Sequence, residues 1–104
     1  EEHNLSKGGS INEGKASERT NINGIPAAAE YLIVKRDIEL CEKLESKLHI
    51  AHVSVKESVE LLREAKHRGV DVTSEVAPHH FILTDDIITS NNTYAKVNPP
   101  IRSQ

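Results

Sequence analysis

Methionine and tryptophan are absent from this sequence of 104 residues, and only 3% of the residues are aromatic. Aromatic side chains supply much of the apolar area that a core buries, so an independent domain of this composition would have a sparse core. Cys41 is the only cysteine, which excludes an internal disulfide and favours a reducing cytoplasm. The missing start methionine and the sparse core together predict that the chain is an internal piece of a longer protein.

Long apolar runs and an excess of positive charge are also missing. No run approaches the roughly 20 apolar residues of a membrane-spanning helix, and the first two dozen residues are too polar for a signal peptide. The net charge is -3 with 28% charged residues, which leaves no basic surface for nucleic acid or an anionic membrane. We therefore expect a cytoplasmic protein that binds neither nucleic acid nor membranes.

The first half of the sequence contains a glycine-rich stretch followed by a helical pattern. Residues 1–25 hold four of the five glycines among polar residues without any period, which predicts a loop. Residues 26–47 open with Pro26, a residue favoured at the first helical position. Apolar residues then recur at steps of three and four opposite a charged face, which predicts an amphipathic helix. The apolar stripe consists of Ala27, Tyr31, Val34, Ile38, Cys41, Leu44 and Leu48.

Residues 48–76 have the pattern of a strand, a helix and a second strand. The short apolar run 48–54 predicts the first strand, and the alternating run 70–76 predicts the second. Ser54 and Glu57 have the spacing of a capping box that starts the helix between them, and Gly69 is a natural helix stop. Consecutive strands joined by a helix pair in parallel with a right-handed crossover, so this segment predicts a βαβ unit.

His52 lies at the carboxyl end of the first predicted strand, where parallel α/β proteins collect ligands and catalytic groups. Alternation places His52 on the same face as Leu48 and Ile50, and His49 on the opposite face. A single histidine on a strand is more often a core residue than a metal ligand. The motifs that accompany His52 reverse that preference.

Residues 77–104 are predicted to form a loop segment beside this strand end. Thr84 can cap a short helix that includes Asp85 and Asp86. The consecutive prolines 99 and 100 force an extended backbone and exclude a helix. Lys96, Asn98 and Arg102 would therefore be presented from a stiff segment, as recognition of an anion or an amide requires. An ordinary exposed loop is the alternative.

Three motifs, HVS at 52–54, EVAPHH at 75–80 and KVNPPIR at 96–102, together resemble the dihydroorotases of the longer-chain bacterial type. These enzymes are cyclic amidohydrolases of pyrimidine biosynthesis. The resemblance implies a (β/α)8 TIM-type barrel of the metal-dependent amidohydrolase superfamily with a centre of two zinc ions. The chain would cover the barrel from the end of strand five to strand seven.

The same resemblance implies two site residues. His52 corresponds to the metal-binding histidine of strand six, and Asn98 to the substrate-binding asparagine. The other metal ligands and the catalytic aspartate would lie outside residues 1–104, so no catalytic residue is assigned here and the segment alone is expected to be inactive. His79 and His80 have no role in the resemblance, and we interpret them as shaping the rim of the site.

The implied reaction is the reversible hydrolysis of dihydroorotate to N-carbamoyl-aspartate, and the partners are the substrate, a second copy in a homodimer, and aspartate carbamoyltransferase. Three alternatives stay open: an inactive dihydroorotase-like scaffold subunit of aspartate carbamoyltransferase, an allantoinase or hydantoinase relative, and a small α/β binding module that uses its histidines for metal. His80 and Asn98 favour dihydroorotase over allantoinase, and His52 with Asn98 argues against the inactive scaffold.

Overall fold

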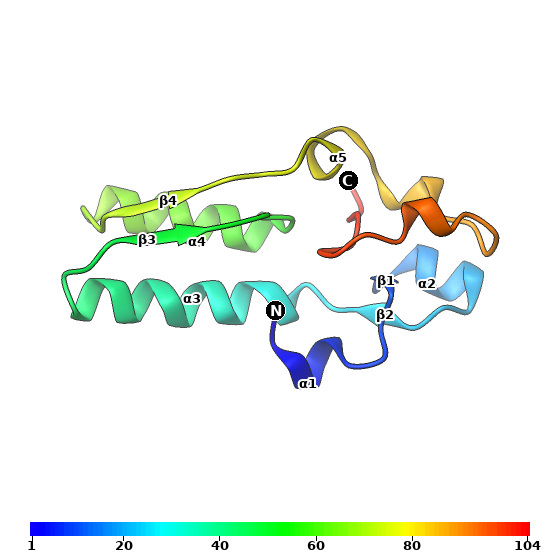
Figure 1. Cartoon of the computed structure of the whole chain (residues 1–104), viewed down its shortest axis with the longest axis horizontal. Helices are drawn as coiled ribbons and strands as arrows, with labels where there is room; N and C mark the ends of the chain where they lie inside the picture. The colour runs from blue at the N-terminus through cyan, green and yellow to red at the C-terminus, as the bar shows by residue number, and fades with distance from the viewer.

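Helices and short parallel strands alternate along the chain in the computed structural model, which describes residues 1–104 (Figure 1). The structure extends over 46 × 28 × 17 Å, and its two halves lie end to end. The elements are α1 (His3–Ser6), β1 (Ile11–Asn12), α2 (Lys15–Thr20), β2 (Gly24–Ile25), α3 (Ala28–Lys43), β3 (Leu48–Ile50), α4 (Lys56–His67), β4 (Val72–Ser74), α5 (Pro78–Ile82) and the 3-10 turns η1 (Asp85–Ile87) and η2 (Thr93–Ala95).

The predicted βαβ unit is confirmed as β3, α4 and β4. The two strands pair in parallel, with Leu48 opposite Val72 and Ile50 opposite Ser74. Each strand has three residues, so both are shorter than the predicted runs 48–54 and 70–76. Helices α3 and α4 pack against each other and cover one face of this two-stranded sheet (Figure 1).

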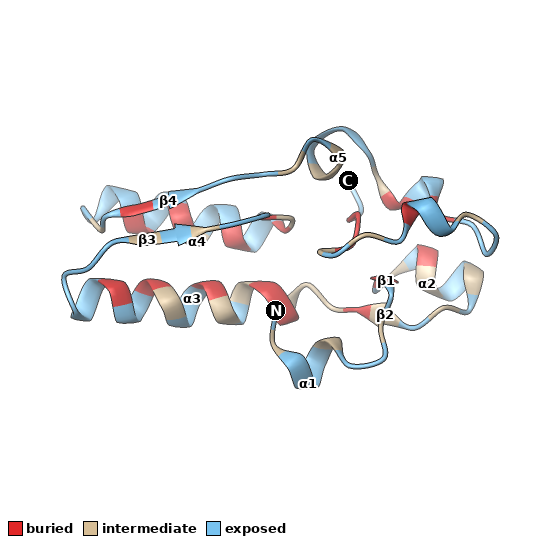
Figure 2. Ribbon diagram, viewed as in Figure 1, coloured by how far each residue is buried: buried red, intermediate tan, exposed pale blue.

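The larger core lies between these helices and the sheet. Val34, Ile38 and Cys41 of the predicted apolar stripe are buried, whereas Leu44 lies beyond α3 and is 68% exposed. Figure 2 shows the buried positions of α3 and α4 on the sides that meet the strands. Leu48 and Ile50 of β3 pack against this core, which is why alternate residues of the strand are apolar. The buried members are Val34, Ile38, Val53, Leu62, Ala65 and Val72.

The prediction of a loop over residues 1–25 is wrong. This stretch contains two helices and a second parallel pair, in which Ile11 lies opposite Gly24. Glycine is needed here for close approach, because a Cβ added to Gly24 would lie 2.5 Å from the Cα of Glu13. Strands of two residues are too short to show a period in the sequence. A second, smaller core lies beside this strand pair. Its buried members are Ile11, Ala16, Ile88 and Ala95.

Helix α3 is shorter than the predicted range 26–47. It begins two residues after Pro26 and ends at Lys43. Glu45 has a left-handed φ of 48°, and the N–H of Ser46 donates to the carbonyl of Cys41 at 3.1 Å. This hydrogen bond satisfies a carbonyl of the last helical turn and turns the chain away toward β3.

The two ends of α4 differ in how well the sequence predicts them. Gly69 has a φ of 83°, and the N–H of Val70 donates to the carbonyl of Ala65 at 3.0 Å, which confirms the glycine stop. The capping box at the other end is wrong. Val55 occupies the capping position, and its apolar side chain cannot form a capping hydrogen bond. The hydroxyl of Ser54 donates to Glu30 of α3 instead.

None of the helices has both the length and the apolar character needed to cross a membrane.

Residues 1–104 expressed alone should self-associate in solution. The β3–β4 sheet has two outer edges without a strand partner, and the neighbouring Phe81 and Ile82 are 80% and 72% exposed. Unpaired edges beside apolar surface favour association. Sedimentation velocity measures the mass directly. The chain should form dimers or larger species, and a well-folded monomer at micromolar concentration would contradict this prediction.

Candidate functional site

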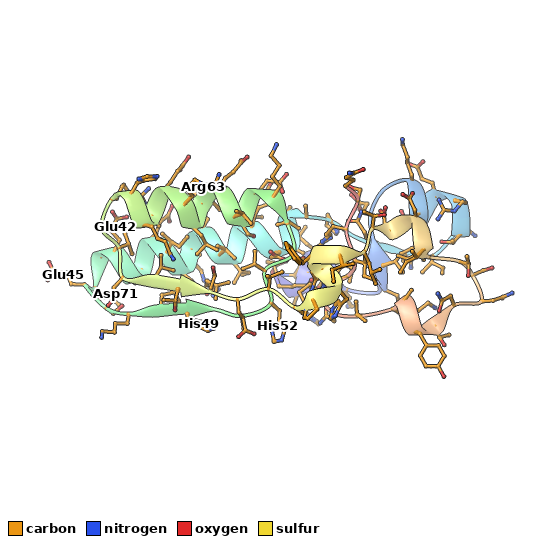
Figure 3. All side chains as sticks on the ribbon, turned by 90° about the horizontal axis from the view of Figure 1, so that it is seen from above. Glu42, Glu45, His49, His52, Arg63 and Asp71 are labelled. Atoms are coloured by element: carbon orange, nitrogen blue, oxygen red, sulfur yellow. The ribbon has the colours of Figure 1, made fainter.

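His52 follows β3 but does not lie on the predicted face. Its φ is 55°, in the left-handed region, so the strand ends at Ile50 and the alternation of side chains is interrupted. Figure 3 shows His49 and His52 on the same side of the sheet, opposite the helices. The predicted sharing of one face by His52, Leu48 and Ile50 is therefore wrong, as is the placement of His49 on the face away from His52.

Glu75 lies between these two histidines. One carboxylate oxygen is 3.6 Å from Nε2 of His49, and the other is 3.6 Å from Nε2 of His52. His49 also shares a 2.8 Å hydrogen bond between Nδ1 and the hydroxyl of Thr73. The His52 side chain is 57% exposed, so water reaches its imidazole from the face that the helices leave free. This ring is available to bind a ligand.

His52 and the segment that carries Asn98 meet at one cavity of about 240 Å³. Glu1, His49, His52 and Pro99 contribute to its lining, together with residues of α3. Asn98 itself does not line this cavity; it is exposed and directly precedes Pro99, while Pro100 and Ile101 are buried. A larger hollow of about 550 Å³ lies between α4 and β4, but neither His52 nor Asn98 lines it.

His80 forms a hydrogen bond with the segment 98–102, which is called the Asn98 segment below. Its Nε2 lies 2.6 Å from the carbonyl oxygen of Pro99. A carbonyl can only accept, so the neutral ring carries its proton on Nε2 and donates it. The buried Nδ1 has no hydrogen-bond partner. Burial is the main reason that the pKa of His80 is lowered, because a second proton would have to lie on the buried Nδ1.

Arg102 also holds this segment. The sequence predicts that Arg102 is presented to a ligand, and this is wrong, because the residue is only 9% exposed. Its Nη1 donates to the side-chain oxygen of Asn12 at 3.0 Å and to the carbonyl of Ile25 at 2.8 Å. Its Nε donates to the hydroxyl of Ser54 at 3.2 Å. Burial lowers the pKa of Arg102, although Glu30 and Glu1 oppose that effect.

Glu30 completes this buried network. One carboxylate oxygen accepts the N–H of Ser54 at 3.0 Å and the N–H of Val55 at 3.2 Å, and the other accepts the hydroxyl of Ser54 in a short hydrogen bond. Asn12, which accepts from Arg102, also donates its side-chain amide to the Asp85 carboxylate at 2.8 Å. Asp85 is therefore tied to the N-terminal strand pair. Thr84, the predicted cap of its helix, makes no capping hydrogen bond.

Sequence reasoning missed the network of Glu30, Ser54 and Arg102. One signal was present. Glu30 falls four residues before Val34 on the apolar stripe of α3, where a charged residue requires a buried partner. The partner itself was not readable, because Glu30 and Ser54 are 24 residues apart. The charged face of α3 is exposed as predicted, with Arg36 bonded to its neighbour Asp37.

The residues of the chain do not build a complete metal site. No group of three or more histidine, cysteine, aspartate or glutamate side chains is arranged to hold a metal ion. A zinc site needs about three or four protein ligands. The exposed imidazole of His52 fits the role of one ligand, and the rest of such a centre would have to come from residues other than these.

No family model matches the chain. Proteins named dihydroorotase match it along its full length. The dihydroorotase of Pelotomaculum thermopropionicum is 56% identical over 103 residues, and that of Endomicrobium trichonymphae is 53% identical over 104 residues. The resemblance to dihydroorotases is confirmed. The match covers 99% and 100% of this chain but only 24% and 25% of these relatives, so the chain spans about a quarter of their length.

Two D-hydantoinases have a similar structure. One has a TM-score of 0.66 and 29% identity, and one from a Bacillus sp. AR9 has a TM-score of 0.71 and 28% identity. Each comparison covers 76% of this chain and 18% of the hydantoinase. The mixed α/β architecture expected from the resemblance is therefore confirmed, and the dihydroorotases are the more similar group in sequence.

The lowered pKa of His80 predicts a loss of stability in mild acid. The unfolded chain takes up a proton near the ordinary histidine pKa of about 6.5, whereas the folded chain takes it up only at lower pH. Stability is therefore complete above that value and falls as the pH drops through the folded pKa. NMR titration of the His80 ring should give a midpoint below about 6.5.

The variant His80→Gln serves as the control, because glutamine can still donate to the Pro99 carbonyl but does not titrate. The ring resonances assigned to His80 should disappear in this variant, and the free energy of unfolding should depend less on pH below the ordinary histidine pKa of about 6.5. A titration midpoint at or above the ordinary value would contradict the burial of Nδ1.

Proposed function

We propose that the chain supplies the sixth and seventh strands of a (β/α)8 barrel in a dihydroorotase, with β3 as strand six and β4 as strand seven. The observation that carries this proposal is that His52 and Pro99, the residue directly after Asn98, line one cavity at the carboxyl end of β3. The identity of 46–56% to dihydroorotases along the whole chain gives it independent support.

The two faces of the β3–β4 sheet fit this placement. Helices cover the outer face of the strands in such a barrel, as α3 and α4 cover one face here. The opposite face carries His49, Thr73 and Glu75 and would line the interior. The hollow between α4 and β4, lined by Val59, Val76 and Phe81, would receive the next strand and helix.

In this proposal the enzyme hydrolyses the cyclic amide of dihydroorotate reversibly to N-carbamoyl-aspartate. The residues of this chain bind one metal ion and orient the substrate. Two zinc ions, when bound, would polarise the amide carbonyl and lower the pKa of a bound water. His52 would supply one neutral imidazole ligand. The exposed Asn98 carries both a donor and an acceptor, so its side chain can pair with an amide or a carboxylate of the substrate.

The D-hydantoinase likeness supports a second candidate, a cyclic amidohydrolase acting on a different ring. The identity of 28–29% to these enzymes is well below the identity to dihydroorotases, so dihydroorotate is the preferred substrate class. An inactive scaffold subunit bound to aspartate carbamoyltransferase would not need an accessible His52. A homodimer and a place in pyrimidine biosynthesis follow from the proposed family and are predictions.

A chimeric enzyme tests the proposal. Residues 1–104 replace the matching quarter of the P. thermopropionicum dihydroorotase, which supplies the rest of the barrel. The chimera should bind zinc and hydrolyse dihydroorotate, with allantoin and hydantoin as comparison substrates. A folded chimera that binds metal but prefers hydantoin would support the second candidate, and a folded chimera without metal or activity would support the inactive scaffold.

In this chimera, His52→Ala should remove one zinc ion and most of the activity, because loss of a ligand opens the coordination sphere. Metal content per chain and turnover of dihydroorotate are measured on the same preparation. His67→Ala is the matched control, since His67 is exposed at the end of α4. Full metal content and normal turnover in His52→Ala would exclude His52 as a ligand.

Asn98→Ala should lower turnover of dihydroorotate without changing metal content. The unpaired polar groups of the bound substrate would cost about 1–3 kcal/mol, which appears in kcat/KM. Asn91→Ala is the control, because Asn91 is an exposed asparagine of the neighbouring loop. If Asn98→Ala instead releases zinc, the residue supports the metal centre and does not bind the substrate.

A further inference from the structure

One buried hydrogen-bond network contains a residue close in sequence to each of the two candidate site residues. Ser54 lies two residues after His52, and Arg102 lies four residues after Asn98. These two network residues are bonded directly, because Nε of Arg102 donates to the hydroxyl of Ser54 at 3.2 Å. The same hydroxyl donates to Glu30, which also accepts the N–H groups of Ser54 and Val55. Glu30 belongs to the first turn of α3, so one helix end holds both segments.

We propose that Glu30, Ser54 and Arg102 are positioning residues that fix Asn98 relative to His52. This inference rests on the proposed function, in which His52 binds metal and Asn98 binds the substrate. None of the three residues contacts the substrate in this proposal. They act by holding the two segments that carry the site residues.

The backbone between each network residue and its site residue is stiff. Pro99 and Pro100 separate Asn98 from Ile101 and Arg102, and each proline fixes its own φ. Pro100 and Ile101 are fully buried, and so they cannot adjust independently. On the other segment, the buried Val53 is the one residue between His52 and Ser54. A shift of Arg102 relative to Ser54 would therefore be passed on to Asn98 relative to His52.

The network buries charged groups, and the free-energy cost of that burial is high for a contact whose only role is to stabilise the fold. Burying a guanidinium and a carboxylate takes two charges out of water, and buried ion pairs often add no net stability compared with apolar residues. Nη2 of Arg102 has no hydrogen-bond partner, and its nearest carboxylate oxygen, on Glu1, is 3.9 Å away. The guanidinium instead supplies directional bonds to three separate segments, through Asn12, Ile25 and Ser54. Directional bonds of this kind fix geometry.

Arg102→Lys in the chimera is the principal test, because lysine keeps the charge but loses the planar fork of donors. We expect kcat/KM for dihydroorotate to fall by about tenfold or more, mainly through a higher KM, while zinc content stays at the parent level. Crystal structures of the parent and the variant should show Asn98 displaced relative to His52. Arg68→Lys is the matched control, because Arg68 also forms a paired contact with a glutamate, Glu42, far from the site.

Ser54→Ala provides a second variant that leaves both charges in place. It removes the hydroxyl that joins Arg102 to Glu30, and it should reproduce the rise in KM. This variant decides the question if Arg102→Lys does not fold. A lower melting temperature with unchanged kcat/KM and an unmoved Asn98 would show that the network is only structural and would overturn the proposal.

The test separates this inference from the proposed function. A parent chimera without dihydroorotase activity would refute the proposed function. The crystal structures would then still decide whether the network positions Asn98, because displacement of Asn98 relative to His52 in Arg102→Lys, and not in Arg68→Lys, does not depend on turnover.

Discussion

The arrangement of the segments around the candidate site depends on the carboxylate of Glu30, which is 7% exposed at the start of α3. A buried carboxylate is costly unless it is fully hydrogen-bonded. Glu30 accepts two backbone N–H groups and one hydroxyl from the turn between β3 and α4. These bonds hold the chain where α4 begins and place the Ser54 hydroxyl, which accepts from Arg102. Arg102 in turn bonds Asn12 and Ile25, which joins the C-terminal segment to the N-terminal strand pair. Position 30 therefore joins the helical core to the segments that carry the candidate site.

Local patterns in the sequence were sufficient to predict the helical half of the fold. The apolar stripe of α3, the glycine stop of α4 and the parallel strands β3 and β4 all depend on residues close together in the chain. The position of His52 at the end of β3 was also predictable, because the apolar run before it is short. The likeness to dihydroorotases depended on three short motifs and could be recognised without any structure.

The incorrect predictions have physical causes that lie outside local patterns. The left-handed φ of His52 reverses the face of its side chain, and alternation cannot anticipate that turn. Ser54 has the spacing of a helix cap, but a carboxylate 24 residues earlier takes its hydroxyl. Arg102 looks available in a polar loop, yet its partners Asn12 and Ile25 lie 90 and 77 residues away. Each of these contacts depends on the folded arrangement of distant segments.

The closing of the C-terminal segment onto the N-terminal strands also sets an order of folding. The contacts among α3, β3, α4 and β4 join elements that are consecutive or separated by one element, so they can form with little loss of chain entropy. The small core of Ile11, Ala16, Ile88 and Ala95 joins the two ends of the chain, and the bond from Arg102 to Asn12 spans 90 residues. During synthesis the helical half can assemble first. The segment carrying Asn98 can dock only after residue 102 has left the ribosome, so this part of the structure is completed last.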